Sequence, residues 1–157
     1  MKTRSTEQQC LLIEKVTRLF EHQICFNEFL GFRIQSLEPQ PVKICFQMRP
    51  ELIGHYQYGR LHGGVISSVL DVTGGLAVMM GIADYFNDDT ADEIMARFAV
   101  LATIDMRVDY LRQGIGDSFT ASAELVRLGK RVGVTRSTLH NDKGSLIATG
   151  NANYVVN

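Results

Sequence analysis

The chain has 157 residues, of which 45% are hydrophobic and 21% are charged, so one globular domain spanning 1–157 is expected. Its 16 basic and 17 acidic residues give a net charge of −1, which excludes an overall attraction to nucleic acid or to an anionic membrane surface. The three cysteines are odd in number and lack CxxC spacing, so neither a disulfide framework nor a metal site is expected. With no signal peptide visible at the N-terminus, a reducing cytoplasm fits this composition.

The N-terminal third predicts one helix and two strands. Apolar residues recur at helical spacing over residues 6–24, which predicts an amphipathic helix. Strands are expected over residues 30–38 and 41–49, joined through Pro39 and Gln40, and apolar and polar residues alternate along the second strand. One face of that strand should therefore be buried.

A long apolar segment then covers residues 63–82 and contains a single charged residue, Asp71. Twenty residues at 1.5 Å each make a helix of roughly 30 Å, which is long enough to cross a bilayer. A membrane span would leave the amphipathic strands of the chain with nothing to cover their apolar face. We therefore expect a core helix around which the sheet wraps, and no membrane partner.

The C-terminal half predicts four more strands. Residues 84–98 are acidic and should hold a short surface helix that starts near Thr90. Short turns then separate strands at 101–111, 118–128, 131–140 and 145–156, which predicts an antiparallel meander. The expected fold is α+β, with a long central helix wrapped by a curved antiparallel six-stranded sheet and an extra N-terminal helix.

Asp71 is the first residue that suggests chemistry. Burying an unpaired carboxylate costs several kcal/mol, so Asp71 requires a hydrogen-bond donor, a cation or a water-filled cavity. One explanation is structural, with the carboxylate bonded to the backbone or to the hydroxyl of Ser67 or Thr73. The other is functional, because perturbed buried carboxylates cluster in active sites.

The start of the long helix is the second such feature. Gly63 and Gly64 follow His62, and two glycines at a helix N-terminus leave backbone N–H groups uncovered at the positive end of the helix dipole. Such groups stabilise an oxygen that gains negative charge. Alternatively, the glycines only allow close packing against the sheet, and His62 is only a hydrogen-bonded residue near the helix start.

The spacing of these features decides how they can combine. Gly63 and Asp71 are eight residues apart, about 12 Å along a helix axis, which is too far for both to touch one small reacting group. Two such helices lying antiparallel across a two-fold axis would bring Asp71 of one protomer to the helix start of the other. The spacing therefore predicts a homodimer with composite active sites.

Four segments of the sequence together resemble those of a known protein family. They are the sequence from His62 to Asp71, the strand from Thr103 to Arg112, the Gly129-Lys130-Arg131 turn and the final strand from Ala148 to Val155. Together they resemble the hotdog-fold acyl-CoA thioesterases of the PaaI-like class, over residues 28–156, and most of all the YigI-like bacterial members. The resemblance implies hydrolysis of medium- or long-chain acyl-CoA to a free acid and CoA, by a homodimer or a dimer of dimers.

The resemblance also implies roles for single residues. The amide of Gly63, at the Gly63-Gly64 helix start, would polarise the thioester carbonyl. Asp71 would act as a general base toward water, or as a nucleophile through an acyl-enzyme anhydride. His62 would order the loop or form a hydrogen bond near the thioester. No metal and no cofactor would be needed beyond the CoA that the substrate carries.

The residue that positions water is ambiguous in this chain. Many members of the class have Asn or Gln six or seven residues before the histidine, where this chain reads His55-Tyr56-Gln57. His55 and Gln57 are therefore alternatives for that role.

The phosphates of CoA would need cations at the mouth of the site. Lys130 and Arg131 lie in a tight turn and Arg112 lies at a strand end, where each could meet a phosphate; the alternative is a solvated hairpin. Two other functions also stay open. One is dehydration or hydration of an acyl thioester, with His62 as the base and Asp71 as the nearby acid, and the other is an acyl-CoA-binding protein without catalysis.

Overall fold

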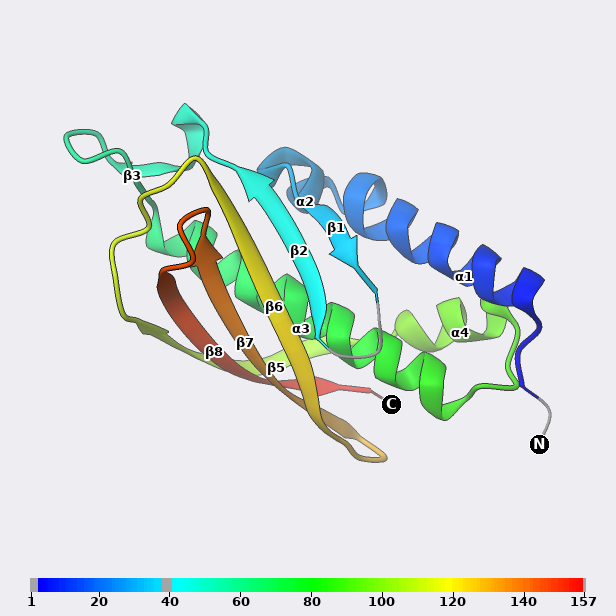
Figure 1. Cartoon of the computed structure of the whole chain (residues 1–157). Helices are drawn as coiled ribbons and strands as arrows, with labels where there is room; N and C mark the ends of the chain where they lie inside the picture. Colours follow the sequence, from blue (N-terminus) through cyan, green and yellow to red (C-terminus); the bar gives the residue numbers. More distant parts are fainter. Residues whose placement is uncertain (1–2, 38–40, 157) are drawn as a thin grey trace.

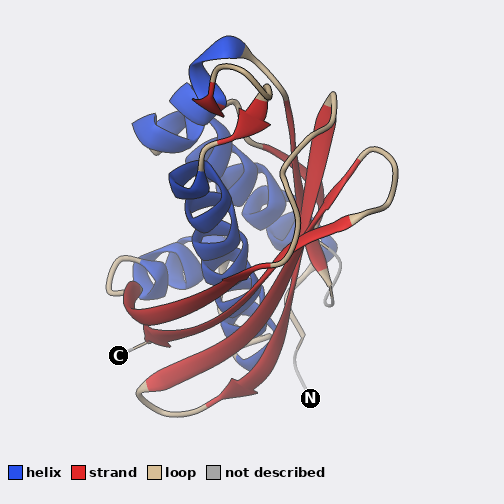
Figure 2. Ribbon diagram, turned by 90° about the vertical axis from the view of Figure 1, so that its left-hand side faces the viewer, coloured by secondary structure: helices blue, strands red, loops and turns tan. Residues whose placement is uncertain are grey.

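The computed structural model describes residues 3–37 and 41–156, and its centre is the helix α3 (Gly63–Tyr85). A six-stranded antiparallel sheet lies against this helix (Figure 1) and curves around it, as the turned view in Figure 2 shows. The strands are β1 (Arg33–Ser36), β2 (Val42–Gln47), β5 (Ala102–Tyr110), β6 (Ser118–Leu128), β7 (Val132–Asn141) and β8 (Leu146–Val155). This is the α+β hotdog arrangement that the sequence predicts; the predicted connection through Pro39 and Gln40 lies outside the described residues.

Helix α3 is apolar on every side because it packs on every side. Leu70, Leu76 and Val78 are completely buried in it, and the helix contacts five of the strands as well as α4 (Ala91–Phe98). By length and composition α3 could cross a membrane, yet most of its apolar stretch is buried inside the domain. The helix is thus the predicted core element, and it continues three residues beyond the predicted end.

Further helices pack around the central helix and the β1 edge of the sheet. Helix α1 (Thr6–Arg18) continues into a π-helical turn at Leu19–Gln23 and is followed by α2 (Cys25–Leu30). The predicted helix over 6–24 is therefore confirmed in most of its length, whereas α2 was not expected. Helix α1 contacts α4, which begins next to Thr90, as the sequence predicts, and a capping box between Thr90 and Glu93 closes its start.

The predicted meander is wrong at one point. The strand order is β1-β2-β6-β7-β8-β5, so β5 pairs with β8 and not with its sequence neighbour β6. The connection over residues 111–117 can span about 23 Å, which exceeds the roughly 14 Å across three strand spacings. Strand β5 therefore forms an edge of the sheet, and its apolar residues Ile104 and Tyr110 are 51% and 55% exposed.

The segment before α3 contains a small hairpin where the sequence predicts only a loop. A short 3₁₀ turn at Pro50–Leu52 leads into β3 (Ile53–His55), which pairs with β4 (Arg60–Leu61). Strands of three and two residues are too short to produce a periodic pattern in the sequence. The hairpin projects beside the start of α3 (Figure 1) and leads directly into it.

Candidate active site

His62 caps the start of α3. Its backbone is extended, with φ −65° and ψ 139°, and its Nδ1 accepts a hydrogen bond of 2.9 Å from the Gly64 N–H. A Cβ on residue 64 would lie 2.9 Å from the same Nδ1, so the close capping contact explains glycine at this position. Because Nδ1 accepts, a neutral His62 ring carries its proton on Nε2.

The two glycine amides at this helix start are not equivalent. The Gly64 N–H is engaged by His62, whereas the Gly63 N–H has no hydrogen-bond partner within the part of the chain that the structure describes. The Tyr110 hydroxyl donates 3.1 Å to the Gly63 carbonyl oxygen and so ties the helix start to β5. One amide, that of Gly63, is thus available to an oxygen of a ligand, at the positive end of the helix dipole.

Asp71 is half-buried on α3, and two hydroxyls from the sheet hold it. Its Oδ1 accepts hydrogen bonds of 2.9 Å from Thr103 Oγ1 and 3.3 Å from the Tyr154 hydroxyl, which also donates 2.8 Å to the Asp71 backbone oxygen. The expected structural partners are engaged elsewhere: Ser67 donates to the Gly64 carbonyl and Thr73 to the Val69 carbonyl. The Asp71 carboxylate is therefore oriented by β5 and β8, not by its own helix.

Tyr154 shares its one phenol proton between two acceptors, the Asp71 backbone oxygen at 2.8 Å and Asp71 Oδ1 at 3.3 Å. The residue is 2% exposed, and burial, followed by the charge of the neighbouring Asp71, raises the pKa of its phenol far above the usual range. A Cβ at position 74 would collide with the Tyr154 hydroxyl, so Gly74 makes the space in which that hydroxyl reaches Asp71.

Sequence reasoning did not identify Thr103, Tyr154 or Tyr110 as site residues. The Thr103 and Tyr154 hydroxyls reach Asp71 across 32 and 83 residues of sequence, and no local pattern encodes such contacts. The sequence places Thr103 in a predicted strand, but it does not show which residues that strand faces.

Within one chain, the structure does not bring the predicted pair together. Gly63 is the first residue of α3 and Asp71 the ninth, which separates them by about 12 Å along the axis. The donors of Asp71 and the free amide of Gly63 therefore belong to two half-sites, one at the helix start and one in its middle.

The two alternatives for positioning water lie in the projecting hairpin. His55 ends β3 and stacks on Tyr56, with 5.6 Å between ring centroids, and its Nδ1 is buried without a hydrogen-bond partner among the described residues. Gln57 is exposed in the turn that follows. Among the described residues, neither side chain forms a hydrogen bond with Gly63 or Asp71 of the same chain.

The three predicted phosphate-binding cations do not lie together. Arg112 follows β5 at the end where Tyr110 meets Gly63, and it donates 3.0 Å to the Leu146 carbonyl oxygen. Lys130 and Arg131 lie in the turn between β6 and β7, and Lys130 shares a pocket with Tyr85 at the opposite end of α3. A helix of 23 residues is about 34 Å long, so the three cations cannot serve one site in a single chain.

The described residues contain no group of three or more His, Cys, Asp or Glu side chains that could hold a metal ion. The two half-sites together offer one carboxylate with two hydroxyl donors in one, and one free amide beside the hairpin in the other. Such a set can polarise a carbonyl group and activate a water molecule.

Comparison with known proteins agrees with this chemistry. Residues 58–148, more than half of the chain, match the family model described as the thioesterase superfamily. The chain is 37% identical over 151 residues to the medium/long-chain acyl-CoA thioesterase YigI of Escherichia coli (strain K12), with 96% of both chains covered.

Solved structures show the same relationship. A protein from Shewanella oneidensis related to the thioesterase superfamily is 40% identical, with a TM-score of 0.91 over 98% of this chain and 100% of its own. A hypothetical thioesterase protein from Streptococcus pneumoniae TIGR4, crystallised with coenzyme A, shares the fold at 18% identity and a TM-score of 0.63, over 80% of this chain and 85% of its own. The chain therefore belongs to the thioesterase superfamily.

Proposed function

We propose that this protein hydrolyses medium- and long-chain acyl-CoA thioesters in composite sites of a homodimer. The observation that carries the proposal is the Asp71 carboxylate, which two hydroxyls from separate strands hold in a fixed orientation. Membership of the thioesterase superfamily and 37% identity to a medium/long-chain acyl-CoA thioesterase support the reaction and the substrate class.

The geometry supports the following division of labour. The Gly63 N–H of one protomer donates to the thioester carbonyl oxygen, which becomes an oxyanion when the carbonyl carbon is attacked. Asp71 of the other protomer either takes a proton from the attacking water or attacks the carbon itself to form an anhydride, which water then hydrolyses. Either route breaks the carbon–sulfur bond and releases CoA and a free acid. Neither route uses a metal or a further cofactor.

The edge strand β5 supports the dimer. It runs for nine residues with one side unpaired, and long free edges are usually covered or paired. Exposed apolar side chains, including Ile104 and Tyr110, lie along it. Pairing of β5 with its two-fold mate would cover this edge and bring Asp71, which Thr103 of β5 contacts, toward the second helix start. A dimer of dimers is a further possible assembly of the same unit.

The dehydratase and hydratase alternative requires His62 as a base. Its Nδ1 already accepts the Gly64 N–H, and Nε2 then carries the proton in the neutral ring. Neither nitrogen is free to take a proton from substrate while the cap is formed. A binding protein without catalysis would not need the two hydroxyl donors that orient Asp71. Hydrolysis is therefore the function that these contacts favour.

The test is release of free thiol from hexanoyl-, dodecanoyl- and hexadecanoyl-CoA by the wild type and by Asp71→Ala. We expect turnover in the wild type that falls about 10²- to 10⁴-fold in the variant, while binding of a nonhydrolysable acyl-CoA analogue persists. Asp88→Asn, which changes an exposed acid between α3 and α4, serves as the control and should leave turnover unchanged. Normal turnover in Asp71→Ala would remove Asp71 from the mechanism.

A further inference from the structure

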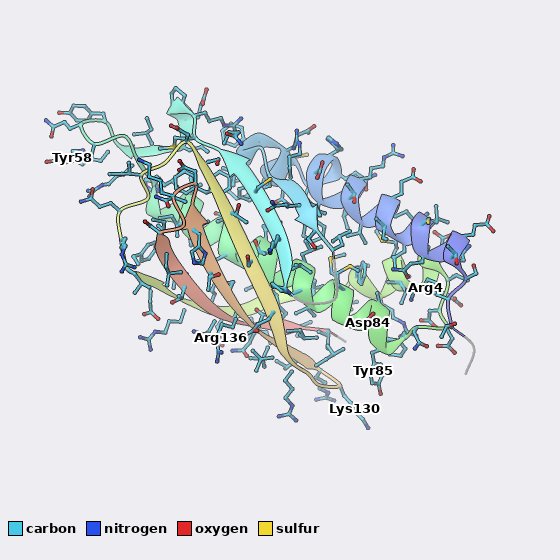
Figure 3. All side chains as sticks on the ribbon, in the orientation of Figure 1. Arg4, Tyr58, Asp84, Tyr85, Lys130 and Arg136 are labelled. Atoms are coloured by element: carbon cyan, nitrogen blue, oxygen red, sulfur yellow. The ribbon has the colours of Figure 1, made fainter. Side chains whose placement is uncertain are left out.

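A separate pocket lies at the end of α3 that is remote from Gly63. Its volume is about 680 Å³, within the range of small-molecule sites. Helices α3 and α4 and the turn between β6 and β7 contribute to its walls; its apolar lining includes Ile82, Phe86, Val100, Leu128 and Val156. Figure 3 shows Tyr85 and Lys130, two further lining residues, at this end of the molecule.

The charges around the pocket favour an apolar occupant. No acidic side chain lines it in the part of the chain that the structure describes, and its two charged lining residues are Arg97 and Lys130. Arg97 is already engaged, because its Nε lies 2.7 Å from Asp89 and its guanidinium lies 3.6 Å above the Phe86 ring. That leaves Lys130 at the border of an apolar cavity, which is a poor match for the several phosphates of a CoA nucleotide.

A short stretch of chain connects this pocket to Asp71. Val100 lines the pocket, and Thr103, three residues further on, donates its hydroxyl to Asp71; three residues of chain span at most about 10 Å. Along α3, Ile82 lies eleven residues after Asp71, about 16 Å away. Carbon–carbon bonds of about 1.5 Å advance an extended acyl chain by about 1.3 Å each, so about twelve carbons cover that distance.

We propose that this pocket binds the distal end of a medium- or long-chain acyl group whose thioester lies at Asp71. The inference rests on the proposed function, because the acyl group enters the site as part of the thioester. It makes the residues at the C-terminal end of α3 the determinants of chain length. It also makes Lys130 a neighbour of the acyl tail, not a ligand of the phosphates in the same substrate molecule.

Filling the pocket tests this inference. Val100, which is 51% exposed, accepts a larger side chain without disturbing the core. In Val100→Trp we expect kcat/KM for hexadecanoyl-CoA to fall about tenfold or more, because each methylene kept out of an apolar site costs about fourfold in binding. For hexanoyl-CoA, whose tail is too short to reach the pocket, kcat/KM should stay within about twofold of the wild type. Ala96→Trp, which fills the pocket from α4, should have the same chain-length-selective effect.

Val126→Trp is the matched control. Val126 is 54% exposed on β6 and is not among the residues that line the pocket, so this variant should hydrolyse both substrates as the wild type does. An equal loss for both chain lengths in Val100→Trp and Ala96→Trp, or no loss for either, would overturn the inference.

A substrate without the nucleotide separates the two ends of acyl-CoA. Hexadecanoyl-pantetheine should suffer the same selective loss in Val100→Trp as hexadecanoyl-CoA. If the loss disappears with the pantetheine thioester, the nucleotide occupies the pocket and the inference is wrong. If the wild type releases thiol from no acyl-CoA at all, the proposed function itself fails, and the inference with it.

Discussion

The Thr103 hydroxyl on the edge strand β5 lies 2.9 Å from Oδ1 of Asp71 on the buried helix α3. This hydrogen bond links the one charged residue in the apolar stretch 63–82 to the strand whose free edge is available to a second protomer. The position of the carboxylate and the position of the proposed dimer interface are thereby coupled, since a shift of β5 moves the donor that orients Asp71.

Thr103→Val removes this donor and keeps the shape of the side chain. Hydrogen bonds to charged groups contribute about 1.5–3 kcal/mol, so kcat for dodecanoyl-CoA should fall at least about tenfold because the carboxylate loses its orientation. Thr103→Ser restores a hydroxyl and should recover most of the activity. Equal kcat values for the valine and serine variants would show that the hydroxyl has no part in orienting Asp71.

Tyr154→Phe tests the second donor. The phenol donates to both the backbone oxygen and the carboxylate of Asp71 from a fully buried position. Removing it should lower the free energy of unfolding by about 1–2 kcal/mol and lower kcat about tenfold with little change in KM.

The matched control for this variant is Tyr56→Phe. It deletes a hydroxyl that is 85% exposed while keeping the ring that stacks on His55, so stability and kcat should both stay at the wild-type values. A Tyr154→Phe enzyme that loses stability but keeps its full kcat would make Tyr154 a purely structural residue.

Alkaline denaturation should also report on Tyr154. Burial, and then the Asp71 charge, raise the pKa of the folded Tyr154 phenol above its usual value of 10.0, so the folded state holds this proton more tightly than the unfolded state. The corresponding stabilisation is fully present below pH 10 and is lost as the pH rises further. Denaturant titrations from pH 8 to 11 should therefore show a smaller loss of stability in Tyr154→Phe than in the wild type; equal losses would contradict this.

Ile104→Lys tests the β5 edge as an interface. Ile104 is 51% exposed on this strand, and a lysine at this position would place a solvated charge on the edge of each protomer, which disfavours edge-to-edge pairing. We expect the variant to sediment as a folded monomer with little thioesterase activity. Ile115→Lys is the matched control, because Ile115 is 47% exposed but lies in the connection after β5; it should remain dimeric and active.

The fold could be predicted from the sequence wherever a local pattern was long enough. The apolar stretch of α3, the four C-terminal strands and the helix start near Thr90 were all predicted close to their actual bounds. The pairing of β5 with β8 could not be predicted in this way, because a seven-residue connection permits either neighbour. The β3–β4 hairpin and α2 were missed because each element is too short to show periodicity.

Only part of the candidate site could be predicted from the sequence. A carboxylate in an apolar helix and a glycine pair at its start are local anomalies, and both stand out without a structure. The hydroxyls of Thr103 and Tyr154 are ordinary strand residues until the sheet wraps around α3 and brings them to Asp71. Their role depends on tertiary contacts, which the alternation of a strand does not specify.

The substitution Gly63→Pro removes the backbone N–H donor at position 63, because proline has no backbone N–H. Gly63 is the first residue of α3, a position that favours proline. His62 has the extended backbone that a residue before proline requires, with ψ 139°, and a Cβ at position 63 would lie 3.5 Å from the Tyr110 ring, an ordinary contact. Gly63→Pro should therefore fold, bind acyl-CoA and lose at least about 10²-fold in kcat.

Mixing this variant with Asp71→Asn, after dissociation and reassembly of the protomers, tests the composite site directly. If each site takes Asp71 from one protomer and the Gly63 amide from the other, every mixed dimer contains one intact site and one doubly defective site. Two inactive proteins combined in equal amounts should then recover about a quarter of the wild-type activity. A mixture that contains mixed dimers and stays as inactive as its components would contradict the account.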